Sequence, residues 1–205
     1  GSTGLIGSQV LQLLLDSDEY SKVVAITRQD LTPHPKLTQI KTDFQQASNV
    51  IAGHSADDVF CCLGTTMAKA KSKENFYQVD FFYPFLLAKT SLHFGAKRFL
   101  LVSALGANKN ARVYYNQVKG EVEEAIQGVG FPTLHIFRPS LLLGPRRESR
   151  TGEDAAKFVY RYFGFLIPRR LKAIESIKVA RAMIYFASQP QTGVFIHESE
   201  ELQQF

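Results

Sequence analysis

Gly1-Ser2-Thr3-Gly4-Leu5-Ile6-Gly7 opens the chain with a glycine at every third position, and the apolar-periodic residues Val10, Leu11, Leu14 and Leu15 follow. This pattern predicts a loop that leads into the N-terminus of a helix. Glycine suits such a loop because a tight turn needs a positive φ and because a diphosphate must approach the backbone without meeting a Cβ. The unpaired N–H groups and the dipole of the helix attract that anion. The alternative is a Gly-Ser remnant of cloning followed by a chance Thr-Gly, since glycine patterns of this kind also arise by accident.

A strand is expected directly before this loop. In a doubly wound α/β sheet the glycine-rich loop follows a central strand, but the sequence starts at the loop itself. We therefore expect a short apolar stretch of about six residues, a typical strand length, to belong before Gly1.

Length and composition favour one α/β domain. The chain has 205 residues, of which 45% are hydrophobic, enough for one core and too few for two independent domains. Its net charge is +5, and basic residues are scattered through residues 69–73, 146–150 and 169–172 instead of forming one continuous run. This distribution suits an anionic cofactor or substrate and argues against a nucleic-acid partner. The longest apolar run, residues 81–88, is interrupted by Pro84 and is too short to span a membrane. A leader peptide before Gly1 stays open, because the sequence starts inside the glycine loop.

Cys61 and Cys62 are adjacent in an apolar run, so in a strand their side chains point to opposite faces. A structural disulfide is not expected from such a pair, and buried free thiols fit a reducing cytoplasm. We expect low reactivity rather than redox sensing from Cys62, because burial in an apolar strand raises the pKa of a thiol. No Cys/His spacing in the sequence is typical of a metal site.

Short β-branched, apolar runs alternate with helical patterns along the chain. Strands are predicted at residues 23–27, 39–42, 59–63, 98–103, 133–137 and 194–197. Helices are predicted at residues 73–94, with a bend near Pro84 and an end at Gly95, and at residues 113–127, 153–163 and 176–188. This alternation predicts βαβ units with right-handed crossovers and a parallel sheet, that is, an α/β doubly wound Rossmann fold. We expect residues 1–139 to form the nucleotide-binding core of a single domain spanning residues 1–205, with residues 140–205 mainly a substrate lid and the last strand.

Polar residues and glycine follow several of these strands directly. Arg28, Asp43, Gly64, Ser103 and Arg138 each come just after a predicted strand. The carboxyl ends of parallel strands line the ligand crevice, so these are the positions where functional residues are expected.

Tyr115 and Lys119 are four residues apart on a predicted helix, so they share one face about one turn apart. A phenol with the ordinary pKa near 10 is a weak acid–base catalyst at neutral pH, and a neighbouring cation favours the phenolate. Lys119 can supply that charge and can also hold a ribose hydroxyl, while Ser103 can hydrogen-bond a substrate carbonyl beside the phenol. A tyrosine–lysine pair alone arises by chance, so the strand-end serine and the glycine-rich start are what make the pattern specific.

Four motifs carry a resemblance to a known family: residues 1–7 (GSTGLIG), 60–66 (FCCLGTT), 115–123 (YNQVKGEVE) and 137–140 (FRPS), and the segment 147–153 (RESRTGE) is similar too. With these motifs the chain resembles the short-chain dehydrogenase/reductase superfamily in its atypical or extended branch. It is most similar to the Tat-interacting-protein-like oxidoreductases and their bacterial relatives, over nearly the whole chain.

The resemblance implies a Rossmann fold that binds NADP(H) or NAD(H), with Ser103, Tyr115 and Lys119 as the catalytic triad. It implies a diphosphate site at Gly1, Gly4 and Gly7, and further cofactor contacts at Thr3, Leu5, Ile6 and Leu63. The other implied cofactor contacts are Asp43 and Phe44 at the adenine, Gly64 and Thr65 on the adenosine side, Pro139 beside the nicotinamide, and Tyr115 and Lys119. Two departures leave the substrate-polarising step less specified than the cofactor site. Ala104 directly follows Ser103 where many extended members carry further serines, and Asp80 stands where they often carry asparagine.

Arg28 bears on the choice of cofactor. A carboxylate at the end of the second strand binds the ribose 2′-hydroxyl of NAD, whereas an arginine there pairs with the 2′-phosphate of NADP. The pair Thr27-Arg28 offers no acid, so NADP is preferred over NAD. The alternative is an ordinary solvated residue at a strand end.

Two further features each have a functional and a structural interpretation, and a third is interpreted as structural. Arg146, Arg147 and Arg150 either grip an anionic substrate group or form surface ion pairs. The aromatic residues 158–163 either face a membrane or partner or, as their spacing favours, pack in the interior. His135 lies in a predicted buried strand and is interpreted as structural.

Two functions are compatible with these features. The favoured one is an NAD(P)-dependent oxidoreductase that moves hydride between NADP(H) and a carbonyl, hydroxyl or nucleotide-sugar substrate, with Tyr115 as proton donor. The alternative is an NADPH-sensing regulatory protein without turnover, although a sensor has no need of the phenol. Carbonyl reductases, sugar epimerases and dehydratases share these motifs, so the substrate stays open. The expected partner is a small-molecule substrate. The oligomeric state stays open between a monomer and a homodimer, in which, by analogy with related folds, the helices after the fourth and fifth strands pair across a two-fold axis.

Overall fold

The computed structural model describes residues 1–42, 54–144 and 168–205, and its strands form the expected parallel α/β architecture. The largest sheet has the order β3 (Asp58–Cys61), β4 (Arg98–Val102), β5 (Thr133–Arg138) and β8 (Gly193–Glu198). A second pair consists of β1 (Val23–Thr27) and β2 (Leu37–Lys41), and a third of β6 (Leu142–Leu143) and β7 (Ile174–Glu175). All five pairings are parallel.

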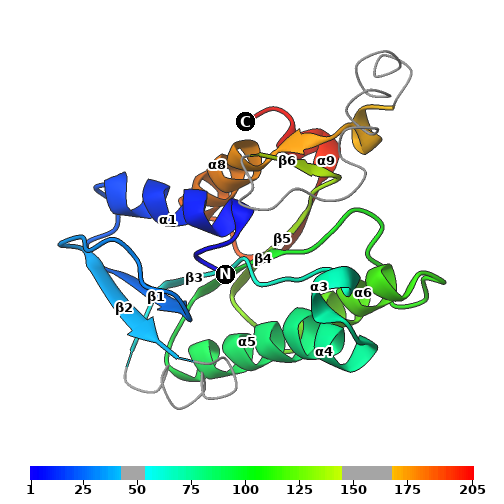
Figure 1. Ribbon diagram of the computed structural model, residues 1–205. Helices are drawn as coiled ribbons and strands as arrows, with labels where there is room; N and C mark the ends of the chain where they lie inside the picture. The colour runs from blue at the N-terminus through cyan, green and yellow to red at the C-terminus, as the bar shows by residue number, and fades with distance from the viewer. Residues whose placement is uncertain (43–53, 145–167) are drawn as a thin grey trace.

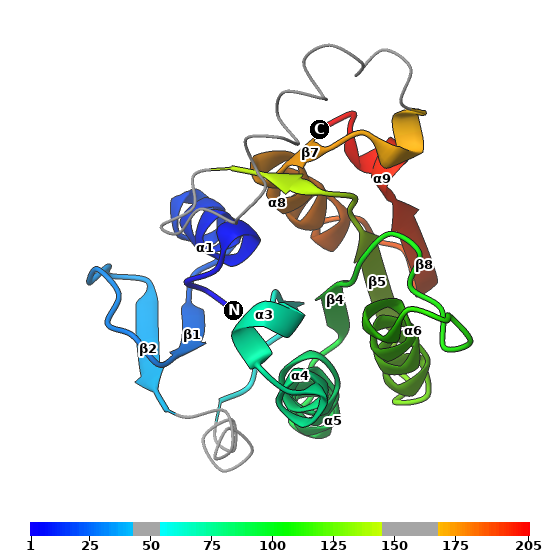
Figure 2. The same ribbon diagram turned by 45° about the vertical axis from the view of Figure 1, so that its right-hand side comes forward.

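Helices cover both faces of the sheet (Figure 1). α1 (Leu5–Asp16) and α8 (Ser176–Ala187) lie on one face, and α5 (Tyr83–His93) and α6 (Tyr114–Gln127) lie on the other. Shorter segments are α3 (Met67–Ala70), α4 (Lys73–Tyr77), the π-helical turn η2 (Gln78–Phe82), the 3₁₀ turn η3 (Arg169–Leu171) and α9 (Ser199–Leu202). Figure 2 shows β1 and β2 at one end of the molecule and β8 at the other. The doubly wound fold is therefore confirmed.

The six predicted strands all occur, with bounds within two residues of the prediction. The helices predicted at residues 113–127 and 176–188 correspond to α6 and α8. The helix predicted at residues 153–163 lies outside the described residues. β6 and β7 were not predicted, because strands of two residues are too short to show a periodicity.

The long helix predicted at residues 73–94 is confirmed as a continuous helical stretch over residues 73–93, made of three successive segments, α4, η2 and α5. The change of geometry predicted near Pro84 lies in the π-helical turn η2, which ends at Phe82, shortly before the proline. Gly95 ends α5 as predicted, with a φ of +91° and an N–H that donates to the Leu92 carbonyl.

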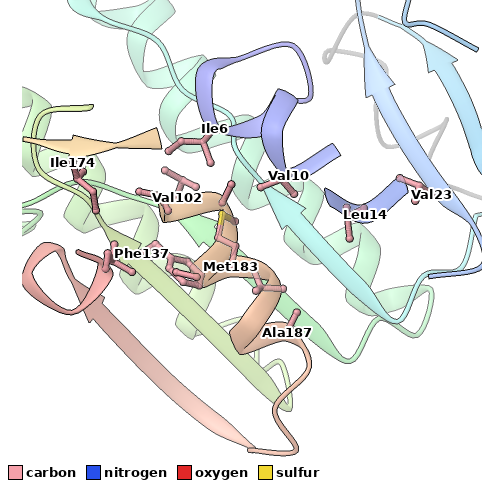
Figure 3. Close-up of a cluster of buried hydrophobic side chains, with 14 of the residues drawn as sticks. Ile6, Val10, Leu14, Val23, Val102, Phe137, Ile174, Met183 and Ala187 are labelled. Carbon is pink, nitrogen blue, oxygen red and sulfur yellow. The ribbon is translucent and has the colours of Figure 1, made fainter. Parts of the chain in front are cut away.

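The larger apolar core lies between α1, α8 and the sheet (Figure 3). Its buried members include Ile6, Val10 and Leu14 of α1, Val179, Met183 and Ala187 of α8, Val102 of β4 and Phe137 of β5. A second core on the opposite face joins the sheet to α5 and α6 and includes Phe99, Val122 and Ile126. β4 and β5 are almost entirely buried because helices cover both of their faces.

A cavity of about 700 Å³ lies between β1 and β3. Val24 and Ile26 of β1, Phe60 of β3 and Leu11 and Leu14 of α1 are among the residues that line it. Within the described residues no hydrogen-bonded ladder joins β1 to β3. The cavity extends along the facing edges of the two strands and is not confined to their carboxyl ends, where ligands of parallel sheets bind, so we do not assign it to a substrate.

Candidate functional site

The glycine loop lies against the end of β3 and leads into α1. A Cβ on Gly1 would collide with the backbone carbonyl of Cys62, and a Cβ on Gly7 would collide with the carbonyl group of Gly1. Gly4 differs because it is exposed and a Cβ there would meet only the Gly1 carbonyl oxygen, at 3.2 Å. Gly1 and Gly7 therefore allow close contacts within the protein, while the exposed Gly4 leaves room for a ligand to approach the backbone.

The positive φ expected in this loop is wrong. Gly4 has a φ of −80° and a ψ of 174°, and Gly7 lies within the helix α1. The positive-φ glycines of the described residues are Gly95, Gly106, Gly130 and Gly193. The opening glycines are needed because they lack a Cβ, and not because the backbone is left-handed.

The helix α1 starts with unpaired backbone donors. Gly4 is its N-cap and has no side chain to accept a hydrogen bond, and the first turn contains no acidic residue. The first bond within the helix runs from the Ser8 N–H to the Gly4 carbonyl at 2.9 Å. The N–H groups of Leu5, Ile6 and Gly7 therefore have no acceptor within the helix, and with the helix dipole they suit a phosphate.

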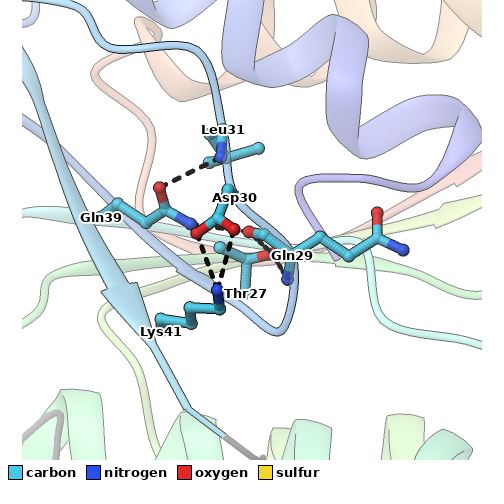
Figure 4. A network of polar contacts seen from close by, with 6 residues as sticks. All are labelled: Thr27, Gln29, Asp30, Leu31, Gln39 and Lys41. Carbon is cyan, nitrogen blue, oxygen red and sulfur yellow. Dashed lines mark hydrogen bonds and ion pairs between the residues drawn. The ribbon is translucent and has the colours of Figure 1, made fainter.

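Arg28 is exposed directly after β1 and makes no ion pair or hydrogen bond within the described part of the chain. The loop that carries it is held by side-chain contacts (Figure 4) among Thr27, Gln29, Asp30, Leu31, Gln39 and Lys41. Asp30, the first acid after this strand, pairs with Lys41 at 2.8 Å. The end of β1 thus presents a free guanidinium, which suits an anionic group.

A buried ion pair lies at the end of β3. Lys119 Nζ, from α6, is 2.8 Å from Oδ1 of Asp80 in η2, and the two side chains are 5% and 0% exposed. Asp80 Oδ2 accepts a hydrogen bond from the Thr65 N–H at 2.8 Å. A Cβ on Gly64 would lie 3.3 Å from Asp80 Oδ1 and 3.6 Å from Lys119 Nζ, so glycine lets this backbone approach both charges. The loop after Leu63, which is buried, is thereby joined to both helical segments.

Lys119 keeps its charge in this position. Burial by itself lowers the pKa of Lys119, but the Asp80 carboxylate and, after it, the Tyr115 phenol act in the opposite direction. The pKa of Lys119 therefore stands above its ordinary value. A fully charged ammonium is available at the end of β3.

Ser103 directly follows β4 and is 4% exposed. Its N–H donates to the Phe137 carbonyl at 2.7 Å, while its hydroxyl has no hydrogen-bond partner within the described residues. The loop after Ser103 is also held in place, because the Leu105 N–H donates to the carbonyl of buried Pro139 at 2.9 Å. Buried hydroxyls are normally satisfied, so the Ser103 hydroxyl has capacity for a further group.

The loop after β4 is fixed to the start of α6. Asn116 Nδ2 donates to the Gly106 carbonyl at 3.0 Å, and the Asn108 N–H donates to the Asn116 carbonyl at 3.0 Å. Gly120 is required in α6 because a Cβ there would collide with the backbone of Asn108. The serine-bearing loop and the helix that bears the tyrosine and lysine thus form one connected unit.

Tyr115 is half-buried on α6, with its ring 5.5 Å from the fully buried ring of Phe76. Lys119 lies one turn further along the same helix, and the Tyr115 phenol is one of the groups that raise the pKa of its ammonium. Its neighbour Tyr114 is directed elsewhere, since its hydroxyl donates to the Lys73 carbonyl at 3.3 Å. The structure therefore brings together Tyr115, Lys119 and the ends of β3 and β4.

Arg138 has a structural role. Its Nη2 lies 2.6 Å from Glu123 Oε2 and its Nη1 lies 2.9 Å from Glu198 Oε1. Glu123 is 2% exposed and belongs to α6, so the arginine ties that helix to β5 and β8. Although Arg138 comes at a strand end, its donors are engaged by two carboxylates.

Several predicted residues lie outside the described ranges. These are Asp43 and Phe44, expected at the adenine, the arginines of residues 146–150 and the aromatic residues 158–163. One residue of the cluster, Asp80, was noted in the sequence only as a departure from the family pattern. An acid within an apolar run was the available signal, because a buried carboxylate needs a partner.

Other kinds of site find no support in the described residues. Residues 1–42, 54–144 and 168–205 contain no group of three His, Cys, Asp or Glu that could hold a metal ion. Cys61 and Cys62 are free, and burial raises the pKa of Cys61 and raises the pKa of Cys62 to about 12. No helix in the same ranges has the length and apolarity needed to cross a membrane.

Sequence comparisons agree on the family. A model of the family described as NAD(P)H-binding matches residues 1–163. Protein HTATIP2 of Rattus norvegicus is 36% identical over 200 residues, covering 94% of this chain and 81% of that protein. Protein FMP52, mitochondrial, of Candida albicans is 33% identical over 201 residues, covering 94% and 88%.

Solved structures share the fold. The Bordetella bronchiseptica enzyme WbmH in complex with NAD⁺ has a TM-score of 0.74 at 19% identity, covering 97% of this chain and 74% of that one. UDP-glucose 4-epimerase of Thermotoga maritima with UDP-glucose has a TM-score of 0.70 at 16% identity, covering 97% and 75%. At these identities the likeness concerns the fold alone. The family match over residues 1–163 and the two sequence relatives show that the chain belongs to the NAD(P)H-binding family, with HTATIP2 and FMP52 among its relatives.

Proposed function

We propose that this protein is an NADP-dependent oxidoreductase that interconverts a carbonyl and a hydroxyl group on a small-molecule substrate. The observation that carries the proposal is the cluster at the ends of β3 and β4. There Tyr115 lies beside the buried ammonium of Lys119, on a helix fixed to the loop that follows Ser103. Membership of an NAD(P)H-binding family supports a redox role for this cluster.

The residues present fit a dinucleotide. The unpaired N–H groups at the start of α1 would hold the diphosphate, and exposed Gly4 leaves room for it. Arg28, free at the end of β1, would pair with a 2′-phosphate, and Asp30 is engaged by Lys41 instead of being free for a 2′-hydroxyl. The free Arg28 and the engaged Asp30 favour NADP over NAD.

The chain's own residues would orient the substrate and move the proton. The Ser103 hydroxyl would hydrogen-bond the substrate oxygen, and the Tyr115 phenol would donate a proton to that oxygen during reduction. Lys119 would hold a ribose hydroxyl and interact with the charge of the phenol. The bound nicotinamide would supply or accept the hydride.

Tyr115→Phe tests the catalytic assignment. We expect NADPH-dependent turnover of an accepted carbonyl to fall by about 100- to 10,000-fold, the usual effect of losing a general acid. NADPH affinity, measured by fluorescence titration, should change less than about twofold, because the diphosphate and 2′-phosphate contacts are intact. Tyr114→Phe is the matched control, since the Tyr114 hydroxyl contacts only the Lys73 carbonyl among the described residues.

The substrate screen should cover aldehydes, quinones and nucleotide sugars. Parent-like turnover by the Tyr115→Phe protein would remove the catalytic assignment. NADPH binding without turnover on any class, together with partner capture that depends on NADPH, would favour the sensing function instead.

We also propose a reducing compartment, with the cytoplasm as the expected one. Cys61 and Cys62 are free thiols, as is usual in such compartments. The FMP52 relatives carry the word mitochondrial in their names. Fractionation of cells that express the full-length protein would decide between the two locations.

A further inference from the structure

Asp80 is a buried charged group that the proposed mechanism does not use. Its side chain is 0% exposed, and both of its oxygens are engaged, one by Lys119 Nζ and the other by the Thr65 N–H. It lies in the π-helical turn η2 between α4 and α5. Such turns interrupt an α-helix and occur often at functional sites. Here the turn places the Asp80 carboxylate at the end of β3.

This contact changes the charge that Tyr115 experiences. An unpaired ammonium at Lys119 would act on the phenol as a full positive charge and favour the phenolate. With the Asp80 carboxylate 2.8 Å from Lys119 Nζ, the pair carries no net charge, so it acts on the phenol more weakly than the ammonium alone would. The cancellation matters because both side chains are buried, where water screens little.

We propose that Asp80 is a positioning residue, which fixes the Lys119 ammonium at the end of β3 and offsets its charge, so that Tyr115 keeps its proton at neutral pH. This inference rests on the proposed function and gives it a direction: the site is arranged to reduce an aldehyde or ketone. The carbonyl gains a hydride from NADPH, which becomes NADP⁺, and a proton from the phenol, which regains one from water. The C=O π bond is replaced by one C–H and one O–H bond.

A purely structural role for Asp80 would involve the same contacts, so a control is needed. Asp58 is also a buried acid, with its side chain 7% exposed and Oδ1 2.8 Å from Arg98 Nη1. It also accepts a hydrogen bond from the Tyr20 hydroxyl at 2.9 Å. Asp58 begins β3, whereas Asp80 lies at the other end of that strand. Asp58→Asn therefore removes a comparable charge far from Tyr115.

The first measurement needs no turnover. Tyrosines are labelled with carbon-13 at Cζ, the Tyr115 signal is assigned by its loss in Tyr115→Phe, and its pH titration is followed by NMR. In Asp80→Asn the midpoint should move to lower pH by about one unit, because the Lys119 charge is no longer offset. In Asp58→Asn the Tyr115 midpoint should not move. An unmoved midpoint in folded Asp80→Asn would overturn the proposal.

The second measurement is the pH profile of carbonyl reduction. The alkaline limb of kcat/KM should move to lower pH in Asp80→Asn by the same amount as the NMR midpoint, since reduction needs the protonated phenol. A moved NMR midpoint in a protein that reduces no carbonyl would keep the role of Asp80 and reject the proposed function. A moved limb without a moved midpoint would overturn the role of Asp80 alone.

Asp80→Asn leaves a buried ammonium unpaired, so a second variant covers the case in which it fails to fold. The double variant Asp80→Asn with Lys119→Met removes both charges. If the charges cancel in the parent, the Tyr115 midpoint of the double variant stays within about 0.3 pH units of the parent. A rise of about one unit would mean that Lys119 acts uncompensated, which overturns the proposal.

Discussion

Two regions of the molecule differ in whether their polar groups are paired. At the open end, comprising α1 and β1, donors have no partner within the described residues: the first N–H groups of α1 are uncapped and Arg28 is unpaired. At the paired end, comprising β3, β4, β5 and α6, charged groups are buried or half-buried and form ion pairs. A dinucleotide brings its own negative charges, so its site needs free donors. A reacting group needs fixed geometry instead, and buried pairs hold it in place.

The largest loss of stability should come from replacing Gly7, which makes a close backbone contact at the open end. Gly7→Ala places a Cβ against the carbonyl group of Gly1, where only a backbone shift could make room. We expect the free energy of unfolding to fall by about 3 kcal/mol, the upper end of the range for overpacking. Urea denaturation of the parent and the variant measures this loss.

Gly4→Ala is the control for that substitution. Its Cβ would meet only the Gly1 carbonyl oxygen, at 3.2 Å, so the free energy of unfolding should change by less than about 1 kcal/mol. The exposed Cβ would instead obstruct the diphosphate, and NADPH affinity should fall at least about tenfold. Equal losses of stability in the two variants would contradict the distinction between a glycine for contact and a glycine for the ligand.

Acid should destabilise the packing of β5 against β8, where two buried histidines are in contact. His135 Nδ1 lies 2.9 Å from His197 Nε2, and His197 Nδ1 lies 3.1 Å from Glu201 Oε2. Burial, followed by the neighbouring His197, lowers the pKa of His135 to about 4, and burial also lowers the pKa of His197. Below about pH 6.5 these histidines bind protons in the unfolded chain but not in the folded chain. Their contribution to the free energy of unfolding is therefore largest above about pH 6.5 and falls as pH decreases towards 4.

The loss from His135 should reach about 2 to 3 kcal/mol at pH 4, measured as the urea midpoint against pH. His135→Phe should flatten this part of the curve, whereas His93→Gln, at an exposed histidine, should leave it unchanged. The same slope in all three proteins would assign the acid sensitivity to carboxylates elsewhere.

The two ends also differ in how well the sequence predicts them. The strands and the glycine loop were predictable because hydrophobic periodicity and glycine spacing are local signals. Tyr115 and Lys119 were found by their helical spacing, which is local too. The partner of Lys119 was not, because Asp80 is 39 positions away in the chain and reaches it through a π-helical turn that no periodicity encodes. The left-handed backbone predicted for the opening glycines failed for a related reason, since their close contacts are with Cys62 and Leu63, just after β3, and within the loop itself.

The smallest predicted effect separates the cofactors at the open end. Arg28→Ala should weaken NADPH binding by about tenfold, equivalent to about 1.4 kcal/mol, because an exposed guanidinium–phosphate pair is partly screened by water. NADH affinity should change little, since NADH has no 2′-phosphate. Arg181→Ala, at an exposed arginine of α8, removes the same charge elsewhere and should affect neither cofactor. The NADPH-specific loss should also shrink as salt is raised, as expected for an exposed ion pair. If NADH and NADPH lose affinity equally in Arg28→Ala, the arginine acts on the common part of the dinucleotide, and the preference for NADP loses its basis.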